Sequence, residues 1–273
     1  MAKISLKSPA EIRIMAEGGK RLGQILSLVL AKVKPEISTL EIDSWIEDGI
    51  LNVGGIPSFK MVPRYHWASC VGLNEEVVHS IPKENKIIKA GDLLKIDLGM
   101  LWEGFNTDLS WTVQVNSKLI PLLAGQNSKF LETGRKALKE AIKVARVGKR
   151  VGHISQTIQK VIEGAGCHSV EVLTGHGVGR ELHEEPMIPG VLKTNLAQTP
   201  QLLPGMTLAI EIIYTQGDGE VILEDDGWTI STRDGKISGL FEKTIAITGG
   251  GPLILTPLGS RKESPGKRGS FLC

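Results

Sequence analysis

Apolar residues recur at helical spacing in two segments near the start of the chain. The first segment follows Ser8-Pro9-Ala10-Glu11, which has the form of a capping box with proline in the first turn. The pattern continues to Val33, and Pro35 ends the predicted helix. A second capping signal at Ser38 predicts another helix, which runs to about Val53 and is closed by two glycines.

Strand-like and helical patterns follow each other through the rest of the chain. Two longer periodic segments predict helices over residues 130–147 and 151–164. Short apolar runs bounded by turn residues predict strands at residues 70–73, 77–79, 93–98, 105–115, 206–214 and 239–248. The four longest of these strands carry one carboxylate each, namely Asp97, Asp108, Glu211 and Glu242.

The same order of elements, two helices followed by strands, occurs twice along the chain. His79-Ser80-Ile81-Pro82 in the first occurrence matches His183-Glu184-Glu185-Pro186 in the second, and the acidic strands match as well. We therefore predict an α+β fold with two similar halves, about residues 1–120 and 121–250. The halves are expected to face each other across a pseudo-twofold axis.

The composition is that of an ordinary globular protein, with 41% hydrophobic and 23% charged residues among 273. The formal net charge is +2, and residues 258–273 are expected to form a basic, disordered tail. The rest of the chain is close to neutral, so we expect no sequence-specific binding of nucleic acid. The most apolar run, residues 25–33, is too short to span a membrane, and we expect no membrane association.

The three cysteines are Cys70, Cys167 and Cys273, and they have neither zinc-finger spacing nor the pattern of a disulfide framework. Their number and spacing favour a reducing compartment. Because no secretory signal opens the chain, the sequence predicts a cytoplasmic protein.

The most unusual stretch comprises residues 175–186, where His176 lies among glycines and His183 precedes acids and a proline. A helix would place the two histidines on one face, but the glycines disfavour a helix. We expect a strand and a tight turn whose backbone passes close to something bound. The two histidines suit metal ligation or proton transfer, and a loop with two hydrogen-bonded histidines is the simpler alternative.

The four strand carboxylates make metal binding the better explanation. A carboxylate in an apolar strand is costly to bury without a counter-charge, and no matching set of Lys or Arg lies in these strands. Four carboxylates and His176 suit two divalent ions that share bridging acids. Such ligation fits Co, Mn, Fe or Zn, without a choice among them. Taken alone, Asp108 would be interpreted as an ordinary edge-strand or turn carboxylate.

Several motifs together resemble those of the type I methionine aminopeptidases, at residues 74–82, 96–97, 106–108, 175–186, 206–211 and 241–242. The resemblance implies the pita-bread fold, in which two pseudo-symmetric halves of antiparallel sheet, backed by helices, enclose a dinuclear metal site. A single catalytic domain would span residues 1–250. The chain shows no additional N-terminal domain of the kind that similar proline dipeptidases and creatinases carry. The interval between His183 and Glu211 is also too short for the helical insertion of type II enzymes.

The resemblance also implies a reaction. The protein would remove the N-terminal methionine from nascent proteins when the second residue is small and uncharged. A hydroxide that bridges two divalent metal ions would attack the first peptide bond. Peptide or nascent-chain N-termini would be the partners, with ribosome association as a further expectation, and the protein would be a monomer.

By position, the family's metal ligands correspond to Asp97, Asp108, His176, Glu211 and Glu242. Asp108 and Glu242 would bridge the ions, and Glu211 would also act as general acid and base. His183 would stabilise the tetrahedral intermediate, and His79 would assist proton transfer at the scissile nitrogen. The side-chain pocket would be lined by Tyr65, Cys70 and Trp228, with Phe59 and Leu182 as further candidates. Ordinary core packing is the alternative for each pocket residue.

The sequence departs from the family's usual pattern at Ser80, Asn106-Thr107, Ile212 and Lys243. None of these differences removes a ligand, and Lys243 should point away from the face that carries Glu242. A proline-directed dipeptidase and a non-catalytic binding protein on the same fold stay open as alternatives. A binding protein would show no metal-dependent turnover, and a dipeptidase would cleave Met-Pro rather than longer Met-Ala peptides.

Overall fold

The computed structural model describes residues 4–115 and 127–259. The predicted basic tail therefore lies outside the described residues except for its first two positions. Those two positions still contact the folded domain. Leu258 packs against the hydrophobic core of the first half, and Gly259 N–H donates to Ser27 Oγ at 2.9 Å. Ordered contacts thus extend beyond the boundary that the sequence placed at residue 250, and the division into one domain and a tail stays a prediction.

The first two helices begin and end close to their predicted positions. Helix α1 is Pro9–Lys32, and Ser8 caps it in a reciprocal capping box with Glu11. Helix α2 is Thr39–Asn52, and Ser38 Oγ accepts the Glu41 N–H at 3.1 Å. Both N-terminal signals were therefore interpreted correctly.

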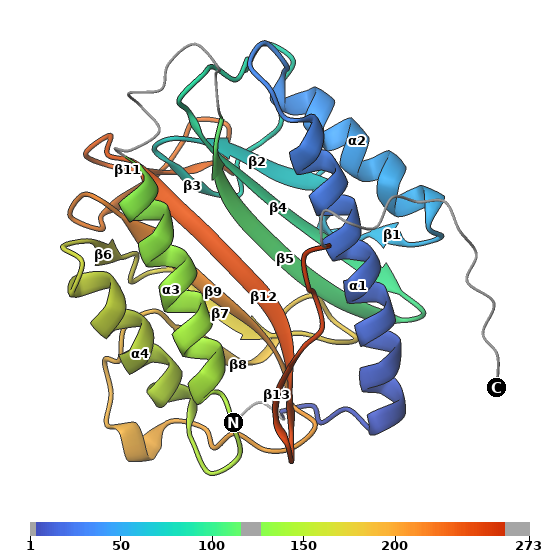
Figure 1. The fold of residues 1–273 in the computed structure, drawn as a ribbon, viewed down its shortest axis with the longest axis vertical. Coiled ribbons are helices and arrows are strands. Elements are labelled where there is room, and N and C mark those ends of the chain that lie inside the picture. Colours follow the sequence, from blue (N-terminus) through green and yellow to red (C-terminus); the bar gives the residue numbers. More distant parts are fainter. Residues whose placement is uncertain (1–3, 116–126, 260–273) are drawn as a thin grey trace.

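The first half of the molecule contains an antiparallel sheet built around one long strand (Figure 1). Strand β4 (Leu93–Trp102) pairs with β5 (Phe105–Gln114) along one edge. Its other edge pairs with β1 (Ile56–Pro57) and β2 (Ser69–Leu73). A short 3-10 helix, η1 (Phe59–Met61), follows β1 and later contributes to the pocket.

The second half repeats this plan with α3 (Ser128–Val144), α4 (Val151–Glu163) and a larger antiparallel sheet. Its central strands are β9 (Thr207–Thr215) and β12 (Ser238–Thr248), which pair over most of their length. The remaining strands of this sheet are β6 (His168–Ser169), β7 (Thr174–Gly177), β8 (Glu184–Pro189) and β13 (Gly251–Ile254). A second 3-10 helix, η3 (Leu196–Gln198), lies between β8 and β9.

A third, smaller sheet connects the halves. Strand β11 (Ile230–Thr232) pairs with β10 (Val221–Leu223) from the second half and with β3 (Glu76–Val78) from the first. The hairpin of β10 and β11 therefore crosses over and covers part of the first half.

The two large sheets meet where β5 and β12 lie side by side (Figure 1). Threonine hydroxyls join them. Thr244 Oγ1 donates to the Asp108 carbonyl at 2.8 Å and accepts the Asp108 N–H at 2.9 Å. Thr112 Oγ1 does the same for Leu240, at 2.7 and 2.9 Å. Each hydroxyl satisfies both backbone groups of the residue opposite, which fixes the two sheets relative to each other.

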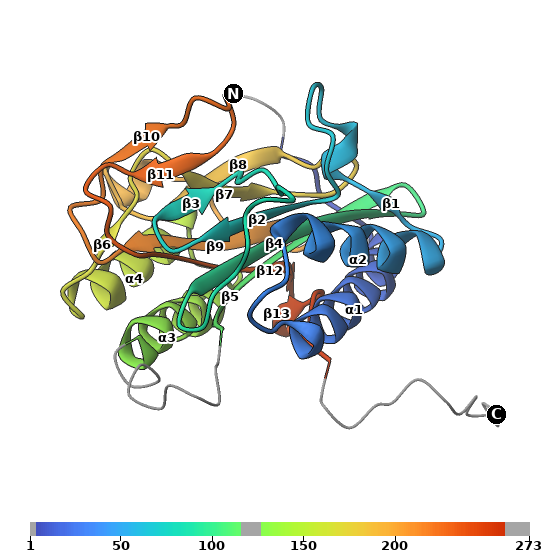
Figure 2. The same ribbon diagram turned by 90° about the horizontal axis from the view of Figure 1, so that it is seen from above.

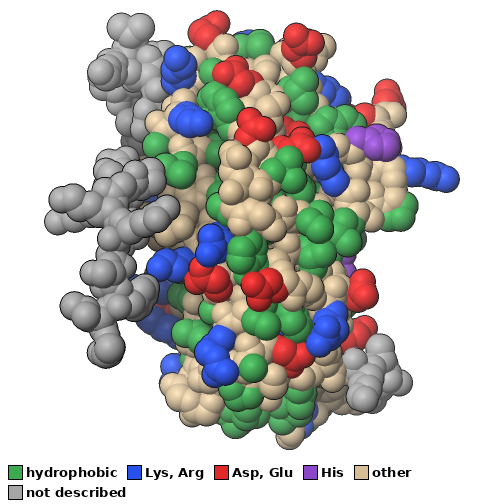
Figure 3. Space-filling model, turned by 90° about the vertical axis from the view of Figure 1, so that its right-hand side faces the viewer, with side chains coloured by type: hydrophobic (Ala, Val, Ile, Leu, Met, Phe, Trp, Pro, Cys, Tyr) green, Lys and Arg blue, Asp and Glu red, His purple; other side chains and the backbone are tan. Residues whose placement is uncertain are grey.

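All four helices cover one face of this combined sheet, and the small sheet of β3, β10 and β11 lies on the other side (Figure 2). One core packs α1 and α2 against β2, β4 and β5, and a second packs α3 and α4 against β9 and β12. On the face seen in Figure 3, basic and acidic side chains are interspersed, as expected from the small net charge. None of the helices within residues 4–115 and 127–259 is long and apolar enough to cross a membrane.

The predicted order of helices and strands in two halves is confirmed. Strands β8 and β13 and the hairpin of β10 and β11 were not predicted, because their short, partly exposed sequences lack a clear apolar alternation. The glycine-rich stretch does form a strand and a bend rather than a helix. Its glycines, however, make room for the protein's own backbone. A Cβ on Gly175 would lie 2.5 Å from the Ala209 carbonyl, and one on Gly177 would lie 2.3 Å from that of Glu185.

Candidate metal centre and adjoining pocket

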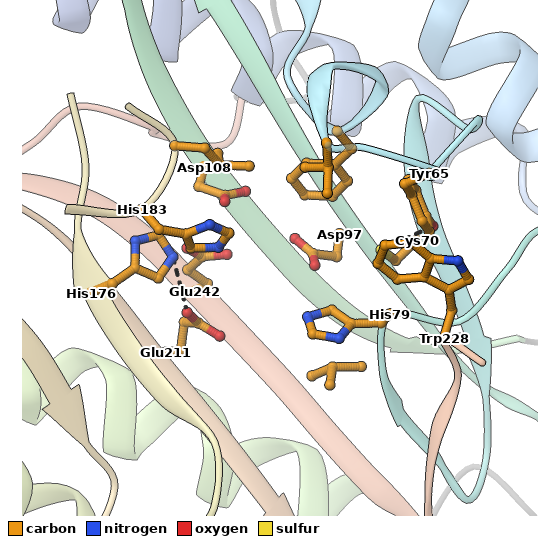
Figure 4. Close-up of a pocket in the computed structure, with 14 residues that line it drawn as sticks. Tyr65, Cys70, His79, Asp97, Asp108, His176, His183, Glu211, Trp228 and Glu242 are labelled. Carbon is orange, nitrogen blue, oxygen red and sulfur yellow. Dashed lines mark hydrogen bonds and ion pairs between the residues drawn. The ribbon is translucent and has the colours of Figure 1, made fainter. Parts of the chain in front are cut away.

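Four buried or half-buried carboxylates converge on the open face of the combined sheet (Figure 4). Glu211 and Glu242 are directly opposite each other in the ladder of β9 and β12. Asp97 and Asp108 lie on β4 and β5 one diagonal apart, since Asp97 is opposite Ser110 and Asp108 is opposite Gly99. Adjacent strands with a two-residue side-chain period thus bring all four acids to one place.

Burial makes these carboxyl groups hard to ionise without a cation. It raises the pKa of Asp108 to about 7. The pKa values of Asp97, Glu211 and Glu242 are also raised well above the usual range, by burial first and by the neighbouring acids second. Asp97 Oδ1 and Glu242 Oε1 are buried without a hydrogen-bond partner in the described structure. Orphaned carboxylate oxygens in a shared cluster fit a site for cations.

His176 on β7 completes the cluster. Its Nδ1 lies 2.8 Å from the Gly177 carbonyl, which can only accept, so Nδ1 carries the proton and Nε2 carries a lone pair. Burial lowers the pKa of His176 to about 4, which keeps the ring neutral. Nε2 faces Glu211 Oε1 at 3.4 Å. Ligand atoms of Asp108, His176 and Glu242 all lie within 4.8 Å of one another. Such a set of acceptors fits divalent metal ions.

Two lysines lie on the strands that carry the acids. Lys95 on β4 and Lys243 on β12 are both buried, so these strands do contain cationic residues. Their ammonium groups nevertheless donate to backbone carbonyls, those of Asn74 and Ser238 for Lys95 and that of Thr256 for Lys243. Neither lysine forms an ion pair with the acids of the cluster among the described residues. Lys243 also lies over the Trp111 ring at 5.1 Å, away from Glu242 as predicted.

The other two histidines lie at the edge of the cluster. The His183 ring is 4.4 Å from that of His176, and His183 itself is exposed to solvent. His79 follows β3 and has a positive φ of 55°. It lies between Glu211 and Trp228, across the cavity from His176 and His183 (Figure 4). Burial, and then the neighbouring His183, lowers the pKa of His79. Both imidazoles are therefore neutral near pH 7 and free to exchange a proton.

An apolar pocket adjoins the cluster on the side of Asp97. Tyr65 stacks edge-on with Trp228 at 5.1 Å, and its hydroxyl donates to the Ser69 carbonyl at 2.9 Å. The same hydroxyl lies 3.1 Å from Cys70 Sγ. Burial raises the pKa of the Cys70 thiol well above its usual range, so the thiol stays neutral and acts as an apolar group. Cluster and pocket together form one cavity of about 160 Å³.

The structure brings every predicted site residue to this cavity: Tyr65, Cys70, His79, Asp97, Asp108, His176, His183, Glu211, Trp228 and Glu242. Phe59 and Leu182, named as further candidates, line it too. Sequence reasoning missed Val62 and Val78. Val62 lies in an irregular segment with no apolar period, and Val78 had been assigned only to a strand, so neither had a signal of its own.

The sequence matches the model of metallopeptidase family M24 over residues 13–248. It is 38% identical over 253 residues to methionine aminopeptidase 1 of Bacillus subtilis (strain 168), with 93% of this chain and 99% of that protein covered. It is 36% identical over 265 residues to the methionine aminopeptidase of Aquifex aeolicus (strain VF5), with the same coverage.

Comparison of the fold with solved structures agrees with the comparison of sequences. It matches the crystal structure of a methionine aminopeptidase from Thermotoga maritima with a TM-score of 0.88 and 35% identity, covering 93% of this chain and 100% of that one. The two halves with a shared acidic cluster are therefore the pita-bread arrangement that the sequence led us to expect. Because the matched residues include both halves and every acid of the cluster, the chain belongs to metallopeptidase family M24.

Proposed function

We propose that the protein removes N-terminal methionine from peptides and nascent chains whose second residue is small and uncharged. The observation that supports this proposal most is that the acidic cluster and an apolar pocket line one and the same cavity. Aromatic rings and the Cys70 thiol suit an unbranched thioether. Relatives that this chain covers almost completely are named methionine aminopeptidases.

We propose two divalent ions, held by Asp97, Asp108, His176, Glu211 and Glu242, and drawn from Co, Mn, Fe or Zn. When bound, such ions polarise a carbonyl group and lower the pKa of water. The orphaned carboxylate oxygens and the bare Nε2 of His176 support this assignment. Metal binding must also displace protons from acids with raised pKa values, so affinity should fall as the pH is lowered below about 7.

The protein's own groups would then bind substrate and move protons. Glu211, whose pKa is raised by burial, would take a proton from the attacking water and return it to the leaving amine. His183, neutral and at the cavity mouth, would donate a hydrogen bond to the scissile carbonyl as negative charge develops. His79 would lie by the scissile nitrogen. Tyr65, Cys70 and Trp228 would hold the first side chain.

We infer that the protein acts as a monomer in the cytoplasm, on chains that emerge from the ribosome. Among the described residues Cys70 and Cys167 are unpaired, which suits a reducing compartment. No membrane partner is proposed.

A panel of peptides tests the proposal. The purified protein, loaded separately with each candidate metal, should cleave Met-Ala-Ser rapidly. It should cleave Met-Leu-Ser slowly, and a Met-Pro dipeptide slowly. Peptides that begin with Lys or Glu should not be cleaved, because the residues proposed to hold the first side chain, Tyr65, Cys70 and Trp228, are uncharged and would desolvate a charged group. Equal rates for Lys-Ala-Ser and Met-Ala-Ser would contradict the pocket assignment, and preference for Met-Pro would favour a dipeptidase.

A further inference from the structure

His183 lies on residues 178–183, a segment between β7 and β8 without regular secondary structure. The segment contributes little support of its own. Gly179 N–H donates to the Glu181 carbonyl at 3.0 Å, and Val178 N–H reaches Thr207 on β9 at 3.1 Å. An imidazole on such a segment needs other contacts to stay in one position.

Asn106 on β5 supplies such contacts from the other half of the molecule. Asn106 is only 3% exposed. The Nδ2 group donates to the carbonyls of Gly179 and Arg180, at 3.1 and 3.0 Å. Its backbone N–H donates to the same Gly179 carbonyl at 2.6 Å. One residue of β5 thus holds two consecutive carbonyls of the segment that carries His183.

The other end of the same amide faces the pocket wall. Ser58 Oγ donates to Asn106 Oδ1 at 2.7 Å, and Ser58 immediately precedes Phe59. Carbonyls can only accept, so the two on the His183 segment fix which end of the amide is the NH₂ group. Asn106 is therefore fully engaged between the pocket wall and the His183 segment.

Other contacts to the segment lie at its margins. Arg180 forms an ion pair with Glu11 at 2.8 Å, but its side chain is exposed, and exposed pairs contribute little. A buried ion pair between Lys7 and Glu184 holds the chain just beyond His183. Arg180 also lies over the ring of Phe105 on β5 at 4.7 Å. Among the described residues, Asn106 supplies the side-chain hydrogen bonds that join the middle of the segment to β5, which carries a proposed ligand. Loss of the Nδ2 donor would leave the Arg180 carbonyl without this hydrogen bond.

We propose that Asn106 is a positioning residue that holds residues 178–183 so that His183 meets the scissile carbonyl. This inference rests on the proposed function of His183. It also gives a role to one of the positions where the sequence departs from the family's usual pattern. Asn106 touches neither substrate nor metal and acts through the segment it holds.

The test uses Asn106→Asp, which keeps the shape and the acceptor for Ser58 but replaces the donor with an oxygen. We expect kcat to fall about 10–100-fold, as a misplacement near 1 Å can cost, with KM changed less than about threefold. Asn52→Asp, the same chemical change at an exposed residue at the end of α2, should leave both constants unchanged.

A double-mutant cycle separates positioning from general damage. In a His183→Ala background, Asn106→Asp should lower kcat by less than about threefold, because the group it positions is already absent. An equal loss in both backgrounds would overturn the proposal. If Asn106→Asp does not fold, Asn106→Ser, which also loses the two-carbonyl contact, is measured in the same two backgrounds.

Amide hydrogen exchange gives a readout that does not depend on turnover. Exchange of residues 178–184 should be faster in Asn106→Asp than in the wild type or Asn52→Asp, while β9 and β12 keep their protection. Unchanged exchange of residues 178–184 would overturn the role of Asn106 even in an active enzyme. An inactive wild type would instead overturn the proposed function, and the exchange comparison would still report on the contact.

Discussion

The two halves of the molecule carry their acids on equivalent strands but connect those strands differently. In the first half, β4 and β5 are joined by a tight turn at Glu103 and Gly104, both with positive φ. In the second half, the chain between β9 and β12 is long enough to form β10 and β11 before it returns. Glu211 and Glu242 face each other directly, whereas Asp97 and Asp108 are offset by one diagonal.

This difference separates the proposed metal centre from the proposed substrate pocket. The strands that carry the acids follow the pseudo-symmetry, and the two divalent ions that we propose would take ligands from both halves. The pocket does not follow it. Its Tyr65 comes from the segment before β2, and its Trp228 comes from the long connection of the second half. Ile81, between β3 and β4, donates its N–H to Thr229 Oγ1 at 3.3 Å and joins the first half to this long connection. Equivalent strands thus supply the acidic cluster, and non-equivalent connections supply the pocket to which we assign the substrate's first side chain.

The largest expected effect comes from removing one acid from each half. Asp108→Asn and Glu242→Gln should each reduce turnover to background, because both acids are proposed to bridge the ions. Steady-state kinetics and elemental analysis of metal content are measured together, with Asp48→Asn on the exposed side of α2 as control. Near-wild-type activity of either variant, at matched metal occupancy, would falsify the dinuclear assignment.

A smaller effect is expected for the two matched histidines. His79→Ala and His183→Ala should each retain two metal ions but lower kcat by roughly 10²–10⁴-fold, the range for a lost proton-transfer group or oxyanion donor. Both kcat and kcat/KM should fall, since the lost contact is made mainly in the transition state. If either variant loses a metal ion, that histidine is a ligand. If both keep metal and full activity, the pair is structural.

The sequence predicted most of the elements and brought the four acids and His176 together for a physical reason, whereas the pocket residues were named from the family resemblance. Carboxylates in apolar strands and glycines around His176 are local departures from an otherwise regular pattern. Such departures can be recognised in the amino-acid sequence alone. Contacts such as that of Asn106 with Gly179 join residues far apart in the chain, with no periodic signal. The partners of the buried lysines could not be predicted for a similar reason, because only the folded chain shows that Lys95 reaches backbone carbonyls.

The smallest expected effect concerns Asp43, a buried acid on a helix of the first half. Asp43 on α2 accepts from Ser69 N–H and Oγ, and burial raises its pKa from 3.8 to about 6. The acid of α4, Glu163, is exposed. A raised pKa in the folded state gives stability that is full below pH 3.8 and is lost as the pH rises through 6.

Asp43→Asn keeps the acceptor and removes this dependence. Its free energy of unfolding, minus that of the wild type, should therefore rise by about 1–2 kcal/mol between pH 5 and pH 8. Urea unfolding of metal-free protein at both pH values measures the difference, and Asp48→Asn serves as the surface control. A difference that does not change with pH would show that Asp43 is ionised at little cost.

The threonine contacts between β5 and β12 bear on how such a molecule could arise. Two copies of one ancestral half, brought together edge to edge, would present unpaired backbone groups to each other. A hydroxyl both donates and accepts, so one threonine on each copy satisfies a whole residue of the other. Neither copy has to shift its strand into exact register with its partner. Two threonine side chains can thus satisfy the backbone groups between β5 and β12 in a duplicated protein. The acids on the same strands are not needed for this contact, so their sequence can differ between the halves.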